Sequence, residues 1–152
     1  MEYMSLRPAY SSAEPRGNLG KFDTGFVKIT SVTASGQVEV SFDVEQFYQG
    51  GLASVEASKD KVRRLEGDYY LRNRYRHIQT LPVAPGAAIV LQADGAHRVY
   101  GIAPESGQGL EVVSPSEFAR RFAQPFFRES RNREWVGIDD GRIVFIMEQF
   151  FP

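Results

Sequence analysis

The sequence contains no cysteine, one tryptophan and two histidines. The lack of cysteine excludes a disulfide framework, thiolate catalysis and zinc or iron–sulfur sites built on cysteine. Neither His77 nor His97 belongs to an H-x-x-x-H or H-E-x-x-H pattern, and the chain has no G-x-S-x-G elbow and no Walker loop. These absences predict no metal site and no cofactor, and they favour a non-catalytic domain over an enzyme.

The chain also lacks an excess of charge, with 18 Lys and Arg residues against 19 Asp and Glu residues and a net charge of −1. Global charge therefore gives no steering toward nucleic acid or anionic membranes. No segment approaches the roughly 20 consecutive apolar residues of a membrane helix, and the first residues contain no apolar signal-peptide core. The sequence as written predicts a cytoplasmic protein without a membrane span. An envelope or secreted protein would be expected if an export signal had been removed.

What is present is an ordinary globular composition, in which 42% of the 152 residues are hydrophobic and 24% are charged. This length predicts one domain with a core of its own. Residues 1–20 are rich in Ser, Pro, Gly and Ala without periodicity, which is typical of a flexible segment. We therefore expect a flexible N-terminal arm over residues 1–20 and a single globular domain over residues 21–152.

Three segments have the alternation and the turn residues of β-hairpins. Their turns are predicted at Ser35-Gly36, Asp94-Gly95 and Asp140-Gly141. Residues 143–147 after the last turn are apolar on both faces. We therefore expect the last strand to lie centrally in a sheet that is covered on both sides.

Two helices are expected between the strands. One begins at Ser114 as its N-cap, with Pro115 at the first helical position and Glu117 completing a capping box.

The other helix is predicted near residues 52–64 and is ended by Gly67. A short helical turn is expected before it, where Asp43 and Gln46 have the spacing of a capping box. Because strands and helices do not alternate as regular βαβ units, the fold class is α+β. The prediction is a small, mainly antiparallel, barrel-like β-sheet of about six to eight strands with two helices.

Three pieces of the sequence resemble a family. They are "VEVSFDVEQFYQGGLA", then "DYYLRN" followed by "IQTLPVAP", and the terminal "EWVGIDDGRIVFIMEQFFP". Together they resemble a group of small uncharacterised bacterial proteins, often exported or lipoproteins, with YYIxN, RTLPV and C-terminal DGxVxxIxEQYLP-like motifs. The resemblance covers roughly residues 21–152 and implies the same domain boundaries. It implies no activity, and this chain lacks the export signal of that group.

The segment "DYYLRNRYRH" (residues 68–77) is the densest group of residue types that bind ligands. Its candidate binding residues are Tyr70, Arg72, Asn73 and Arg76. A straight strand would place Tyr70, Arg72, Arg74 and Arg76 on one face as a basic ladder. A turn at Asn73 would scatter the arginines, and this alternative is favoured because asparagine tolerates left-handed backbone. The arginines would then protect a solvated sheet edge.

A second basic and aromatic segment, residues 122–135, supplies a secondary patch of Arg128, Arg131 and Arg133. Some of the 11 phenylalanines exceed the needs of a minimal core. An exposed cluster that included Phe47, Tyr48, Phe126 or Phe127 would indicate a partner surface.

Three functions remain open on these residues. The first is a non-catalytic binding or interaction domain for a protein or small-molecule partner. The second is single-stranded nucleic-acid binding on an OB-like barrel, with arginines on phosphates and tyrosines stacking on bases. The third is a small hydrolase or isomerase, which would need His77 or His97 beside a carboxylate in a pocket.

Overall fold

Seven strands and two helices form the part of the chain that the computed structural model describes, which is residues 19–65, 67–73, 76–92, 110–124 and 133–149. The strands are β1 (Asp23–Thr33), β2 (Glu39–Gln49), β3 (Tyr69–Arg72), β4 (Ile78–Gln92), β5 (Leu110–Val113), β6 (Arg133–Asp139) and β7 (Arg142–Glu148). The helices are α2 (Gly50–Lys59) and α4 (Pro115–Phe122). The predicted α+β class is confirmed.

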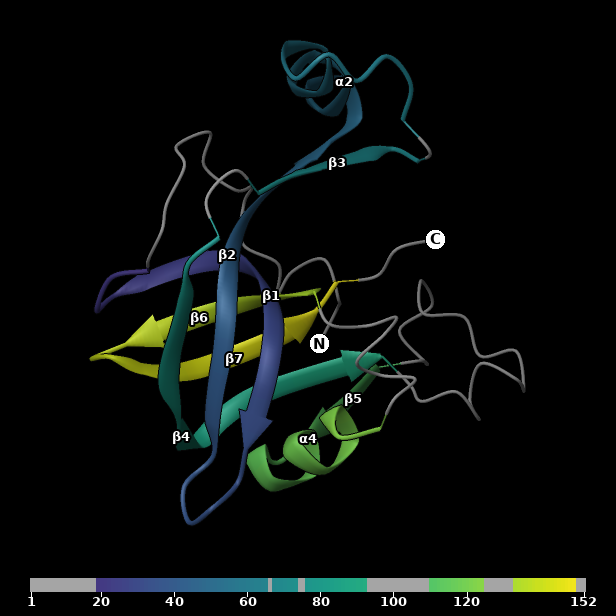
Figure 1. Cartoon of the computed structure of the whole chain (residues 1–152). Helices are drawn as coiled ribbons and strands as arrows, with labels where there is room; N and C mark the ends of the chain where they lie inside the picture. The colour runs from purple at the N-terminus through teal and green to yellow at the C-terminus, as the bar shows by residue number, and fades with distance from the viewer. Residues whose placement is uncertain (1–18, 66, 74–75, 93–109, 125–132, 150–152) are drawn as a thin grey trace.

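Five of the strands close into a barrel (Figure 1). β1 pairs antiparallel with β2 and β6, β6 pairs antiparallel with β7, and β7 pairs parallel with β4. The pairing of β4 with β2 closes the ring, while β3 is added to β2 and β5 is added to β4. The sheet is therefore mainly antiparallel and barrel-like, as the sequence predicted.

The order of the barrel strands is that of an OB fold. Numbered along the chain, the five barrel strands neighbour one another in the order 1-2-3-5-4-1, and the third and fifth are parallel. Helix α4 follows the third strand and precedes the fourth, and its Phe118 and Phe122 are buried in the barrel core. An OB fold is a five-stranded Greek-key barrel, so the tertiary structure narrows the predicted barrel to this connectivity.

Alternation along the strands separates the inside of the barrel from the outside. Val40, Phe42 and Val44 of β2 face one apolar core together with Val27 of β1 and Ile146 of β7. The residues between them on β2 therefore point outward.

The ends of the barrel strands are set by local sequence signals. The residues with positive φ in the two described hairpin turns are Gly36, Asp140 and Gly141, with φ of 84°, 54° and 75°. Ser114 caps α4, because its hydroxyl accepts a hydrogen bond of 3.1 Å from the backbone N–H of Glu117. The two turns and the Ser114 cap are confirmed, but Glu117 does not complete a capping box, because its carboxylate accepts hydrogen bonds from Arg120 and Arg121. The predicted turn at Asp94-Gly95 lies outside the described residues.

The predictions for residues 43–67 need correction. Asp43 and Gln46 do not begin a helical turn, because β2 continues to Gln49 and pairs with β1 on one side and with β4 and β3 on the other. Pairing on both sides satisfies the backbone of β2 and overrides the local capping pattern. Helix α2 begins at Gly50 and ends at Lys59, so it is earlier and shorter than predicted.

Helix α2 ends in a Schellman motif. The backbone N–H of Lys61 donates to the carbonyl of Ser58 over 3.0 Å, and that of Val62 donates to the carbonyl of Ala57 over 2.9 Å. Lys61 has a φ of 62°, in the left-handed region where glycine is usual. A lysine in this position explains why the end of the helix was misplaced at Gly67.

Strand β4 is one long strand that pairs with several neighbours in turn. It pairs with β2 up to Pro82, with β7 at Val83 and again from Ala88, and with β5 from Ile89. The register shifts between Val83 and Ala88, where Pro85 and Gly86 interrupt regular pairing. The bend lets one strand complete two walls of the barrel.

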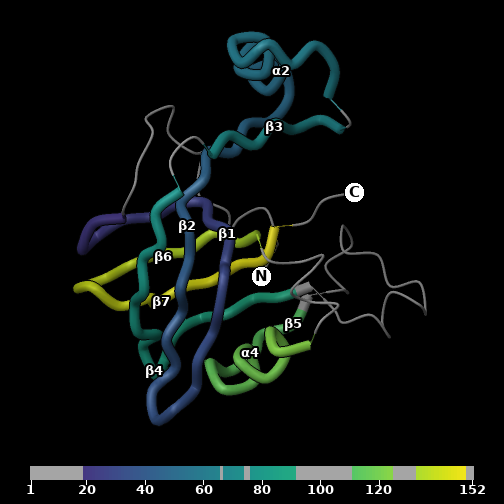
Figure 2. Tube along the Cα trace, in the orientation of Figure 1, coloured from purple at the N-terminus to yellow at the C-terminus, as the bar shows by residue number. Residues whose placement is uncertain are grey.

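The end of β2, α2 and β3 form a unit that projects from the barrel, here named the extension (residues 46–72; Figures 1 and 2). Helix α2 contacts β2 and β3, and the backbone N–H of Gly50 donates to the carbonyl of Asp68 over 3.2 Å. Helix α4 lies at the opposite end of the barrel (Figure 1). The predicted N-terminal arm lies outside the described residues up to residue 18, and the next residue, Leu19, is buried.

Candidate functional site

Strand β3 ends at Arg72, so residues 69–77 do not form one straight strand. The chain does not reverse either, since β4 continues along the same edge of β2. Arg72 lies opposite Gln46, and Ile78 lies opposite Asp43. The two pairings leave only residues 44–45 of β2 between them, so β3 and β4 follow one another along β2 without forming a hairpin. The straight basic ladder is wrong, and Arg74 lies outside the described residues.

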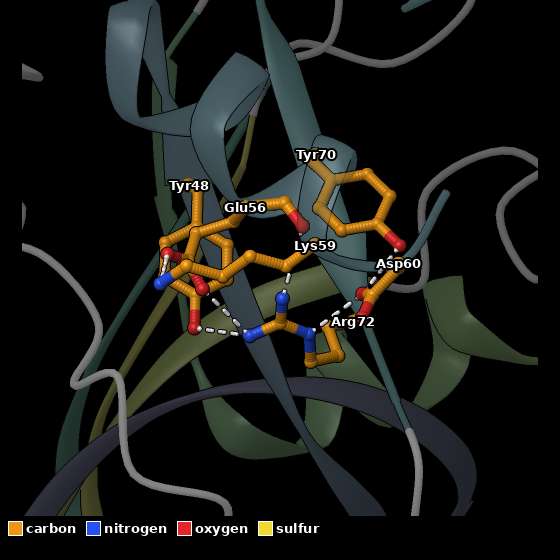
Figure 3. Close-up of polar contacts among 6 residues, drawn as sticks. All are labelled: Tyr48, Glu56, Lys59, Asp60, Tyr70 and Arg72. Carbon is orange, nitrogen blue, oxygen red and sulfur yellow. Dashed lines mark hydrogen bonds and ion pairs between the residues drawn. The ribbon is translucent and has the colours of Figure 1, made fainter. Parts of the chain in front are cut away.

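Arg72 is the centre of a buried polar cluster that joins β2, β3 and α2 (Figure 3). Its Nε donates to Asp60 Oδ2 over 2.8 Å, its Nη1 donates to Glu56 Oε1 over 2.9 Å, and its Nη2 donates to the Glu56 carbonyl over 3.1 Å. The hydroxyl of Tyr48 accepts from Nη1 over 3.2 Å, and the hydroxyl of Tyr70 donates to Asp60 Oδ2 over 2.8 Å. These residues and Lys59 are named the Arg72 cluster.

The electrostatics of the Arg72 cluster shift the pKa of Glu56 and that of Arg72 toward the charged form of each group. Hydrogen bonds from Lys59 and then from Arg72 lower the pKa of Glu56. Burial by itself would lower the pKa of Arg72, but hydrogen bonds to Asp60 and Glu56 raise it above its ordinary value. Burial raises the pKa of Tyr48, which therefore stays a neutral phenol. Because Arg72 is only 7% exposed and bonds to groups of its own chain, its chemistry here is to hold α2 against β2 and β3.

A second polar cluster lies on the outer face of β2 at the base of the extension. Asp43 and Glu45 are buried at 4% and 6% exposure. Asn73 Nδ2 donates to Asp43 Oδ2 over 2.6 Å and to Glu45 Oε2 over 3.3 Å, and the backbone N–H of His77 donates to Asp43 Oδ1 over 2.9 Å. Arg133 Nε donates to Glu45 Oε1 over 2.8 Å. This Asp43–Glu45 cluster holds Asn73 and His77 against the outer face of β2.

The predicted site residues are thus divided between the two clusters. Tyr70 and Arg72 meet at Asp60, whereas Asn73 lies with Arg133 of the predicted secondary patch at Glu45. Arg76 is exposed. Arg128 and Arg131 lie outside the described residues.

Sequence reasoning missed the acidic partners of both clusters. Glu56 and Asp60 lie one turn apart on the predicted helix, which could have indicated a shared cation. Asp43 and Glu45 alternate with inward apolar residues of β2, but Asp43 had been assigned to a helix cap. No local signal identified Arg72 as the cation that Glu56 and Asp60 share, because strand pairing brings them together.

Aromatic side chains on the outer face of the barrel hold the extension from its other side. Phe26 and Phe47 stack with ring centroids 4.8 Å apart, and Trp135 contacts both rings edge-on. Tyr69 of β3 packs against Phe47. Phe47 and Tyr48 are each 1% exposed, so they do not form the exposed aromatic cluster considered above. Phe126 and Phe127 lie outside the described residues.

Two carboxyl groups are buried inside the barrel wall. Glu134 and Glu148 are directly opposite each other on β6 and β7, and Glu134 also lies opposite the core residue Val27. Glu134 is 0% exposed, and both its carboxyl oxygens lack a hydrogen-bond partner within the described structure. Burial, together with the charge of Glu148, raises the pKa of Glu134 well above its usual range. Burial therefore favours the neutral, protonated form of this side chain over the carboxylate.

Neither a metal centre nor a histidine-based site is assembled by the described ranges. They contain no group of three or more His, Asp or Glu side chains placed to hold a metal ion. His77 is exposed, and its bond to Asp43 comes from the backbone. His97 lies outside these ranges, and no helix within them is long and apolar enough to cross a membrane.

The face that binds oligonucleotides in OB folds, on the second and third strands, is formed here by β2 and the first part of β4. The outward residues of β2 along this face are Glu39, Ser41, Asp43 and Glu45, and those of β4 are Ile78, Thr80 and Pro82. This face therefore carries acids and hydroxyls, with neither an aromatic nor a cationic side chain at these positions.

Comparison with known proteins adds no relative, since no family model, no curated protein and no solved structure matches the chain. The resemblance to uncharacterised bacterial proteins stays a prediction.

Proposed function

We propose that this chain is a non-catalytic binding domain that recognises a protein partner through the extension. The observation that carries the proposal is the position of α2, which is held away from the barrel by two sets of contacts (Figures 1 and 3). One contact is the Arg72 cluster on the inner side, and the other is the aromatic packing of Phe47 and Tyr69 on the outer side. A site on a pre-positioned element loses little conformational entropy on binding.

The exposed side of α2 supports a protein partner. Ala53, Glu56 and Ala57 are buried against the extension, whereas Leu52 and Val55 are 43% and 52% exposed. Leu52 and Val55 are three residues apart and therefore share a face of the helix. Apolar side chains presented by a fixed helix fit a hydrophobic groove or helix face of another protein.

Single-stranded nucleic-acid binding is the second candidate, because the barrel has the strand order of an OB fold. Fold alone does not assign a function. Asp43 and Glu45 of this face are buried and bonded within the Asp43–Glu45 cluster, so Glu39 is the exposed acid among its outward residues. None of these outward residues of β2 and β4 is a cation that could bind a phosphate or a ring on which a base could stack. An anisotropy titration with labelled oligothymidylate at low salt tests this candidate, and binding that weakens steeply with salt would favour it.

A hydrolase or isomerase is the third candidate, and its support is weaker. The exposed side chain of His77 is not set beside a carboxylate in a pocket of the described residues. Glu134 has a raised pKa, which is common at active sites, but it is fully buried. Nothing on the described surface brings a substrate to it.

Site-specific photo-crosslinking tests the proposed function. A photoreactive phenylalanine analogue is placed at Val55 of α2 and, as a matched control, at Val112 of β5, which is 73% exposed on the barrel. The full chain is irradiated in cells that express it. We expect a protein adduct from position 55 that position 112 does not give. Identical adducts from both positions, or none from position 55, would contradict the proposal.

A further inference from the structure

We propose that the partner surface of the extension binds an acidic protein segment that carries apolar side chains on one face. This inference rests on the proposed function and names the chemistry of its partner. It follows from what α2 and residues 59–64 present to solvent, which is an apolar stripe that continues into a group of cations.

The apolar half of this surface is the stripe of Leu52 and Val55. Lys59, four residues after Val55, is exposed on the same helical face. Its side chain is 61% exposed, although its ammonium group contacts the buried carboxylate of Glu56 over 2.6 Å. The stripe therefore leads from apolar contacts at the start of α2 to positive charge at its end.

The cationic half consists of Lys61, Arg63 and Arg64, which are all exposed. Within the described ranges, none of the three has an ion-pair partner. The acids of α2 do not neutralise them, because Glu56 and Asp60 bind Arg72 inside the Arg72 cluster. One exposed acid of the extension, Asp68, lies before β3. The buried cluster thus withdraws two negative charges from the surface and leaves the end of α2 positive.

The backbone of Lys61 is a second and independent observation. A residue with a Cβ atom is strained at a φ of 62°, at a cost of roughly 1 to 2 kcal/mol relative to glycine. Glycine would end α2 through the same hydrogen bonds without that cost. A lysine at this position adds a charge where glycine would be more stable, as expected if the charge contacts a ligand.

An apolar stripe beside a group of cations favours an acidic protein segment over a nucleic acid as the partner. A nucleic acid would need stacking aromatic rings beside the cations, whereas the neighbouring exposed side chains are Leu52 and Val55. An acidic segment with apolar side chains at helical spacing matches both halves at once, with apolar contacts at the centre and charges at the rim.

The probe is a fluorescein-labelled amphipathic peptide with leucines at i, i+3 and i+4 positions and glutamates elsewhere. It is titrated with the full chain in an anisotropy assay at about 50 mM and about 500 mM NaCl. Two matched peptides replace the leucines by serine or the glutamates by lysine. We expect binding of the acidic amphipathic peptide alone, weakening at high salt. Equal binding of the lysine peptide, or tighter binding of labelled oligothymidylate, would overturn the inference.

Variants locate the binding on the extension. We expect L52S/V55S and K61S/R63S/R64S to weaken binding at least about tenfold, and the second set to remove most of the salt dependence. The matched controls are V112S and R142S, exposed on the barrel, and they should bind as the parent chain does. Circular dichroism of each variant checks folding. Unchanged binding by folded L52S/V55S or K61S/R63S/R64S would overturn the inference.

The crosslinking experiment separates this inference from the proposed function. If position 55 crosslinks to a basic segment of a partner protein, the inference of an acidic partner segment is overturned, while the proposed binding function of the extension still stands. An absence of any adduct specific to position 55 overturns both.

Discussion

The barrel and the extension are held together by different kinds of contact. In the barrel, Val27, Phe42 and Ile146 are fully buried in a continuous apolar core. In the extension, α2 buries only the small side chains Ala53 and Ala57, and its larger contacts are the ion pairs and hydrogen bonds of Glu56 and Asp60 to Arg72. The barrel is thus held mainly by apolar packing, and α2 is held to a large part by directed polar bonds.

The difference teaches how stability and geometry are divided in this molecule. Apolar burial is non-directional and supplies most of the free energy of folding. A buried ion cluster adds little net stability, but it is intolerant of losing one partner. We therefore expect the barrel to set the global free energy of unfolding, and the extension to open locally at lower cost.

The largest effect is expected from the barrel core. Phe42→Ala removes a ring that is 0% exposed and should lower the free energy of unfolding by about 4 kcal/mol. Hydrogen exchange should then accelerate most in β1, which exchanges through global unfolding, and less in α2, which already exchanges through local opening at lower cost. Phe22→Ala, at a ring that is 68% exposed, is the control and should change little. Faster exchange in α2 alone would contradict the expectation that the barrel core sets the global free energy of unfolding.

The next effect is expected from Arg72→Met, which keeps the aliphatic stem but leaves Glu56 and Asp60 without their shared cation. The local cost should be about 3 kcal/mol, or roughly 100-fold faster exchange of the α2 amides. Exchange in β1 should change much less. Arg76→Met, at an exposed arginine, is the matched control. Equal acceleration in β1 and α2 would show that the extension is not a separate unit.

Glu134→Gln tests one of the two carboxyl groups buried inside the barrel wall, and its effect depends on pH. The folded chain holds a proton on Glu134 above pH 4.5, where the unfolded chain releases it. The free energy of unfolding should therefore fall as pH rises from about 4.5 toward the raised pKa, and level off above it. Urea denaturation across this range should show a flatter slope for Glu134→Gln. Glu39→Gln, on the exposed outer face, should keep the parent slope.

The smallest effect is expected from Lys61→Gly, which relieves the left-handed strain at the end of α2. Protection of the α2 amides should rise by about 1 kcal/mol. The same variant should bind the acidic peptide more weakly. A more stable extension that binds less tightly would show that the charge of Lys61 serves binding and not stability. Ser54→Gly, at an exposed position inside α2, should instead lower protection by about 0.5 kcal/mol. Lower protection in Lys61→Gly would contradict the assignment of strain.

Prediction from the sequence succeeded where a signal and its consequence lie close together. The cap at Ser114 and the turn at Asp140-Gly141 depend on a few adjacent residues. Prediction failed at Asp43, whose capping pattern was overridden by strand pairing, and at Lys61, where a lysine occupies a position that usually takes glycine. The sequence identified part of the candidate site, because it indicated Tyr70 and Arg72 but not their shared partner Asp60.

The sequence by itself determined the local elements of this protein, because alternation, turn residues and helix caps act over a few positions. Closure of the barrel was decided by tertiary structure, through the pairing of β4 with both β2 and β7. The same holds for the Arg72 cluster, whose Tyr48, Asp60 and Arg72 meet only after β3 pairs with β2 and α2 folds back onto both strands. Arg72, which the sequence offered as a binding residue, is buried as an internal contact. The exposed cations of the extension are instead Lys61, Arg63 and Arg64 at the end of α2.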